Sequence, residues 1–137
     1  VNYGNALDLN VTSFAPLINF TGSANVRYTV AMVDPDAPTP QNPTSAQIRH
    51  WLVTDVQAST APTNISSGNV LSGYRAPSPP AGSAPHRYAF FLLQQPAGAN
   101  ITLGNQSAIQ NFNLAAFITL NRLTVVSGNY FNASRTN

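Results

Sequence analysis

Eleven prolines and eight glycines divide this chain of 137 residues into short segments, and that punctuation restricts what the chain can fold into. Proline lacks the amide hydrogen that a helix interior or a central strand requires, so only a few stretches are long enough for regular structure. The segments between the prolines are rich in Val, Tyr, Phe and Thr, which favour strands. The sequence therefore predicts a mainly β fold, an antiparallel β-sandwich with one short helix near the C-terminus.

Five apolar runs are predicted to be strands. Residues 26–33 alternate between two faces, and residues 49–56 are apolar nearly throughout. A short strand is expected at residues 70–71. Residues 87–95 contain the most apolar run of the chain, which places them at the centre of the sheet. The last strand, 125–131, contains a Ser-Gly pair at which we expect a bulge or a turn.

Two long loops and one helix complete the expected organisation. The loops 35–46 and 76–85 contain several prolines each, and loops of such length commonly carry function. Apolar residues spaced as on one helical face follow Asn113, so a capped helix is predicted over 114–121. With 43% hydrophobic residues, the chain is long enough for one domain spanning 1–137.

The small number of charged residues excludes several classes of function. Only 7% of the residues are charged, all of them Asp or Arg, and the net charge is +2. The six arginines are scattered, whereas a nucleic-acid-binding protein has a basic patch. No apolar run approaches the ~18 residues of a membrane-spanning helix. There is no cysteine, which excludes disulfides and thiol chemistry.

Asparagine followed at the second position by Ser or Thr occurs six times, about twice as often as chance predicts for this composition. We interpret these sequons as glycosylation sites of a secreted, extracellular protein whose glycans supply surface polarity. The start at Val1 instead of Met fits a mature chain after signal removal. Accidental sequons in an Asn-rich chain are the alternative. The six positions are Asn10, Asn19, Asn64, Asn100, Asn105 and Asn132.

The two histidines of the chain each follow one of the long loops. His50 lies at the start of the second predicted strand and His86 at the start of the central one. If both loops lie at the same end of the sheet, the imidazoles and the carboxylates of Asp34 and Asp36 converge in one pocket. Such a pocket offers several donors to an anion, with Asp34 orienting a histidine. A purely structural, hydrogen-bonded role is the alternative for each histidine.

Three segments resemble the signature of a known family. Residues 34–38 (DPDAP), 50–55 (HWLVTD) and 74–88, which ends in HRY, resemble in order and spacing the signature segments of the phosphatidylethanolamine-binding protein family. That family includes the Raf kinase inhibitor proteins, plant florigen-type regulators and a yeast carboxypeptidase inhibitor. Residues 113–117 and 126–131 are similar to microbial and fungal members.

The resemblance implies a β-sandwich with an anion pocket at one end of the sheet, which in family members binds phosphate or phospholipid head groups. It implies Asp36 and Arg87 as supporting residues. Ser78 stands where many members have glycine, and its hydroxyl adds a donor for an anion. The implied ligand-binding residues are Asp34, His50, Ser78, Pro80, His86 and Tyr88.

We therefore expect a non-catalytic binding protein for a small anion, either phosphate or a phosphorylated head group. The first alternative is a protein-interaction module or a protease inhibitor of the carboxypeptidase-inhibitor type, with a protease or a kinase as partner. A hydrolase is the third reading, but the sequence has no His-x-His, HExxH or Gly-x-Ser-x-Gly motif. We expect no metal and no cofactor.

Overall fold

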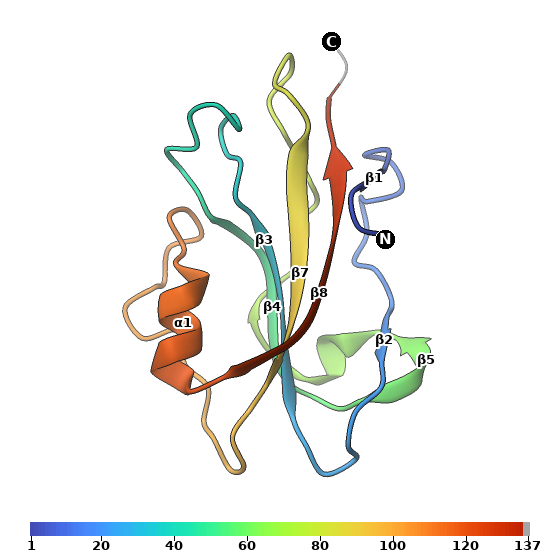
Figure 1. The fold of residues 1–137 in the computed structure, drawn as a ribbon, viewed down its shortest axis with the longest axis vertical. Helices are drawn as coiled ribbons and strands as arrows, with labels where there is room; N and C mark the ends of the chain where they lie inside the picture. Colours follow the sequence, from blue (N-terminus) through green and yellow to red (C-terminus); the bar gives the residue numbers. More distant parts are fainter. Residues whose placement is uncertain (136–137) are drawn as a thin grey trace.

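A six-stranded sheet with the order β1-β8-β7-β3-β4-β6 forms the centre of the computed structural model, which describes residues 1–135 (Figure 1). Neighbouring strands are antiparallel except β1, which runs parallel to β8. The sheet is thus mixed, where the sequence predicted a strictly antiparallel one. Its strands are β1 (Asn5–Ala6), β3 (Tyr28–Asp34), β4 (Ile48–Val56), β6 (Asn69–Ser72), β7 (His86–Gln94) and β8 (Thr124–Ala133).

Smaller elements cover the two faces of this sheet. Strands β2 (Ile18–Phe20) and β5 (Ser59–Thr63) form a two-stranded antiparallel sheet, followed by the short 3-10 helix η1 (Ile65–Ser67). Figure 1 shows this layer on one side of the central sheet and helix α1 (Leu114–Asn121) on the other. The fold is therefore a sandwich with a small second layer.

Alternation along β3 distributes its side chains between two apolar clusters. Val30 and Met32 join the cluster that contains Trp51 and Tyr88, whereas Ala31 and Val33 join the cluster that includes residues of α1. Successive strand residues point to opposite faces, and both faces of β3 are covered. Every residue of β3 is therefore buried, including the polar Thr29 and Asp34.

Helix α1 begins where the sequence predicted. The Asn113 side chain accepts a hydrogen bond of 2.9 Å from the amide of Ala116, as an N-cap residue does. Leu114 and Phe117 are buried against the sheet. The helix ends at Arg122, which has φ +52° and donates its amide to the last turn.

The predicted strands are confirmed within about two residues, with β7 and β3 at the centre of the sheet. The expected irregularity in β8 is a bulge. Leu92 pairs with Ser127 but Leu93 pairs with Val125, so Val126 is the extra residue, one position before the predicted Ser-Gly pair. The short strands β1, β2 and β5 were not predicted. No helix within residues 1–135 is long and apolar enough to cross a membrane.

Candidate functional site

The two long loops meet at one end of the central sheet, the upper end in Figure 1. Because β3 and β7 are antiparallel, the end of β3 lies beside the start of β7. Asp34 at the end of β3 therefore contacts His86, the first residue of β7. His86 also reaches the carbonyl of Pro38 in the first loop. The sheet thus brings together side chains more than 50 residues apart in the sequence.

Asp34 and His86 form a buried pair. Nδ1 of His86 lies 2.8 Å from Oδ2 of Asp34, and the two side chains are 1% and 4% exposed. Nε2 of His86 lies 3.1 Å from the Pro38 carbonyl and 3.0 Å from the hydroxyl of Ser83, which itself donates to the Ala84 carbonyl. A carbonyl only accepts, so Nε2 carries a proton. The contact between Nδ1 and Oδ2 joins the His86 ring to the Asp34 carboxyl group.

A second buried carboxylate is neutralised by an arginine. Asp36 accepts hydrogen bonds from the main-chain amide of Arg87 (2.8 Å) and from its Nε (3.0 Å) and Nη2 (2.7 Å). Burial by itself raises the pKa of Asp36, but the hydrogen bonds and charge of Arg87 outweigh it and leave that pKa below its ordinary value. The amide of Asp36 also donates to Oδ1 of Asp34 (2.7 Å). These contacts hold the first loop on β7.

Only one of the two ring nitrogens of His50 has a hydrogen-bond partner among the described residues. Nδ1 donates to the Arg75 carbonyl at 2.7 Å, and no hydrogen bond to any residue of 1–135 uses Nε2. Burial lowers the pKa of His50, against the opposing effects of the Arg75 carbonyl and the Asp34 charge, while the charges of Arg75 and His86 lower it further. The ring is therefore neutral at pH 7, with its proton on Nδ1 and a lone pair on Nε2.

Tyr88 lies among these rings. Its ring meets His50 edge to face at 5.1 Å and stacks on His86 at 6.4 Å and on Phe131 at 5.3 Å. The residue is 0% exposed, and its hydroxyl is the one buried side-chain polar atom without a hydrogen-bond partner within residues 1–135. Burial and the Asp34 charge raise the pKa of Tyr88. The hydroxyl is thus an unused donor in the middle of the site.

The second loop carries Ser78 and Pro80, both exposed at its surface, while Pro77 and Pro79 are buried. The main-chain amide of Ser78 approaches the Tyr88 hydroxyl and lowers its pKa, although the contact lacks hydrogen-bond geometry. The Ser78 hydroxyl accepts a hydrogen bond of 3.0 Å from Nη2 of Arg135.

The site has a positive balance of charge. Asp34 is paired with His86, Asp36 is paired with Arg87, and the charge of Arg75 acts on His50. Neither Arg75 nor Arg135 has a carboxylate partner within the described part of the chain. No group of three or more His, Asp or Glu side chains in residues 1–135 is arranged to hold a metal ion. Such surroundings suit an anion.

Comparison with known proteins identifies the family. A family model described as "Phosphatidylethanolamine-binding protein" matches residues 1–131. The chain belongs to this family. Similar solved structures are the phosphatidylethanolamine-binding protein from Plasmodium vivax and carboxypeptidase Y inhibitor complexed with its cognate proteinase. The first has 25% identity and a TM-score of 0.83, over 98% of this chain and 79% of that one. The second has 26% identity and a TM-score of 0.77, over 96% and 76%.

Curated relatives are longer than this chain. The "26 kDa secreted antigen" of Toxocara canis is 33% identical over 96% of the chain and 51% of its own length. FLOWERING LOCUS T of Arabidopsis thaliana is 40% identical over 79% of the chain and 58% of its own length. The chain thus spans between half and three fifths of the relatives that it matches.

Three residues of this family member's site were not predicted from the sequence. Ser83 faces Nε2 of His86, and Arg75 and Arg135 bring positive charge to His50 and Tyr88. Ser83 lies inside the second proline-rich loop and Arg75 directly before it. The position of that loop was therefore the sequence feature that could have identified both residues. Arg135 lies outside every motif, and only the course of β8 brings it to Ser78.

The six sequons differ in accessibility. Five asparagines are exposed, whereas Asn132 is half-buried in β8 and its Nδ2 donates to the Gly4 carbonyl at 2.7 Å. A glycan is attached through that nitrogen, so this contact leaves Asn132 poorly placed for modification. The exposed positions are Asn10, Asn19, Asn64, Asn100 and Asn105.

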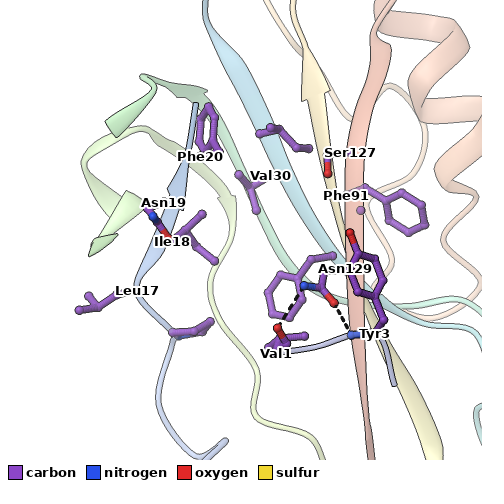
Figure 2. Close-up of a pocket in the computed structure, with 14 residues that line it drawn as sticks. Val1, Tyr3, Leu17, Ile18, Asn19, Phe20, Val30, Phe91, Ser127 and Asn129 are labelled. Atoms are coloured by element: carbon purple, nitrogen blue, oxygen red, sulfur yellow. Dashed lines mark hydrogen bonds between the residues drawn. The ribbon is translucent and has the colours of Figure 1, made fainter. Parts of the chain in front are cut away.

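A separate hollow of about 360 Å³ lies between the N-terminal segment, β2 and one face of the central sheet (Figure 2). Leu17, Ile18 and Phe20 line one side, with Val30 and Phe91 among the sheet residues. None of its lining side chains is Asp, Arg or His. Its lining is mainly apolar, and it contains none of the predicted ligand-binding residues, although the sequon residue Asn19 lies at its edge.

Proposed function

We propose that this chain is a non-catalytic binding protein that takes a small phosphorylated anion at the end of the central sheet. The observation that carries the proposal is the Tyr88 hydroxyl, which is buried among two imidazoles with no hydrogen-bond partner. An unmade hydrogen bond at a buried group costs about 1–3 kcal/mol, so such a group needs a reason. A bound phosphate oxygen satisfies it.

The two histidines of the candidate site have different roles. Both nitrogens of His86 already have protein partners, so its role is to hold Asp34 and the first loop in place. Nε2 of His50 accepts a hydrogen bond from a ligand hydroxyl, or donates once the ring is protonated. Either event takes up a proton relative to a bare dianion. The affinity for the phosphorylated anion should therefore increase as the pH falls from about 7 toward the lowered pKa of His50. The groups that face the His50 ring are Asp34, His86, Arg75 and Tyr88.

Tyr88→Phe is the sharpest test, because it removes only the hydroxyl. In the free protein that hydroxyl has no partner, so the variant should be at least as stable as the parent. Phosphoethanolamine binding, measured by calorimetry or NMR titration, should weaken roughly tenfold or more, the scale of a hydrogen bond to a charged group.

Tyr74→Phe is the matched control. The Tyr74 hydroxyl donates to the Thr12 carbonyl at 2.7 Å, and the Tyr74 ring packs on Trp51. This variant should lose about 1 kcal/mol of stability and keep its affinity. Equal affinity in the parent and Tyr88→Phe, or no binding of phosphate or phosphoethanolamine by the folded parent, would refute the proposed site. His86→Ala is a weaker test because it leaves the Asp34 carboxyl unpaired and buried.

A protein partner is the second candidate function. The observation that favours it is the similarity to carboxypeptidase Y inhibitor, whose structure was determined in complex with its proteinase. If this chain acts in the same way, it should inhibit carboxypeptidase Y at stoichiometric concentration. Full peptidase activity in the presence of an excess of the chain would remove this candidate.

We also infer secretion with N-glycosylation. Five exposed sequons support it, and one relative is a secreted antigen. Expression of the chain behind a eukaryotic signal sequence should give a product whose mass falls on enzymatic deglycosylation. An unchanged mass would contradict the glycoprotein assignment.

A further inference from the structure

Arg135 stands at the rim of the site in a defined position. Its Nη2 donates to the Ser78 hydroxyl at 3.0 Å, across 57 positions of sequence. Its charge reaches the Tyr88 hydroxyl, where it lowers the pKa. The guanidinium is therefore held on the second loop, whose Ser78 amide approaches the Tyr88 hydroxyl.

Within the described residues, no carboxylate pairs with that charge. The two carboxylates of the site are already engaged, Asp34 by His86 and Asp36 by Arg87. Among residues 1–135 no ion pair involves Arg135. A guanidinium presents five donors, so one hydrogen bond to Ser78 leaves the others available to a ligand oxygen.

We propose that Arg135, anchored by Ser78, makes this pocket select fully anionic phosphate monoesters over esters that carry their own ammonium group. This inference rests on the proposed function, because it concerns the ligand of the same site. A phosphate held beside Tyr88 places its ester substituent toward the rim. An ammonium group there is repelled by Arg135, whereas an apolar substituent of the same size is not.

Two ligands of matched size distinguish repulsion of the ammonium group by Arg135 from the overall affinity of the site for phosphate. Phosphoethanolamine and propyl phosphate differ by an ammonium group in place of a methyl group, and both phosphates are mainly dianions at pH 7.5. In the parent, propyl phosphate should bind more tightly than phosphoethanolamine by about two- to fivefold at low salt, the range for a partly exposed charge contact. Higher ionic strength should reduce the ratio.

The variants are Arg135→Gln, Ser78→Ala and, as a remote control, Arg27→Gln. Arg135→Gln should lower the ratio clearly below that of the parent, while any effect of the Arg75 charge remains in both proteins. Ser78→Ala keeps the charge but loses its anchor, so the ratio should fall only in part. Arg27→Gln should keep the ratio of the parent.

The outcomes distinguish this inference from the proposed function. If neither ligand binds the parent, the pocket itself is refuted. If both bind through Tyr88 but the ratio is the same in the parent and in Arg135→Gln, selection by Arg135 is refuted and the pocket stands. An unchanged ratio in Ser78→Ala would overturn the role of Ser78 as the anchor.

Discussion

Arg87→Ala removes the contact that fixes the first loop on the central sheet. In the parent the Asp36 carboxylate is 5% exposed and receives two hydrogen bonds from the Arg87 guanidinium, which is itself 57% exposed. Hydrogen bonds to charged groups contribute about 1.5–3 kcal/mol each, and solvent screening of the exposed partner reduces that contribution. The main-chain amide of residue 87 still donates in the variant. We therefore expect a loss of about 2 kcal/mol in the free energy of unfolding at pH 7.

The pH dependence provides the stricter test. In the folded parent the pKa of Asp36 is below its ordinary value of 3.8. The Asp36 carboxylate therefore contributes its full stabilisation of the fold above pH 3.8, and this stabilisation is lost as the pH falls through the lower pKa of the folded state. In the variant, burial acts without Arg87 and raises that pKa. The difference between parent and variant should thus be largest at neutral pH and shrink as the pH falls toward 3.

Urea unfolding at a series of pH values measures this difference. Arg27→Ala is the control, because Arg27 is exposed and its guanidinium has no ion pair in the described part of the chain. Its effect should stay within about 0.5 kcal/mol. Equal stability of the parent and Arg87→Ala at pH 7 would refute the reasoning, as would a difference of the same size at pH 3.

Three further predictions concern the core, the helix and the sequons. Phe90 and Phe91 are half-buried on opposite faces of β7, so alanine at either position should cost about 2–4 kcal/mol, and unchanged thermal midpoints would contradict the two-faced core. Asn113→Ala should cost about 1 kcal/mol while Asn113→Asp retains the cap, as thermal unfolding would show. Peptide mass spectrometry of secreted protein should find glycans on exposed sequons and an unmodified Asn132; full occupancy of Asn132 would contradict the structural argument.

Elements with a local pattern were predictable from the sequence. The alternating and apolar runs identified the strands of the central sheet other than β1, and Asn113 with its apolar spacing identified α1, because these signals depend only on neighbours in sequence. The strands β1, β2 and β5 gave no such signal. Asn5–Ala6, for example, is a strand only because it pairs with residues 131–132 of β8.

The sequence predicted that four residues of the candidate site would lie together, but it did not predict their hydrogen bonds. The position of the histidines after two proline-rich loops, together with the resemblance of three segments to the family, identified Asp34, His50, His86 and Tyr88 as one group. Their positions in the structure are close together. The sequence contains no information on which nitrogen of His86 meets a carbonyl, because that depends on where the first loop crosses β7.

The sequence by itself determined the β class, the positions of the loops and the capped helix, since each follows from local pattern or composition. Only the tertiary structure decided the parallel β1, the buried Asp34–His86 pair, the unpartnered Tyr88 hydroxyl and the contact of Arg135 with Ser78. The physical reason is the same in each case. These features join segments separated by 40 or more positions, and strand register and loop course, not local propensity, set the distance between their atoms.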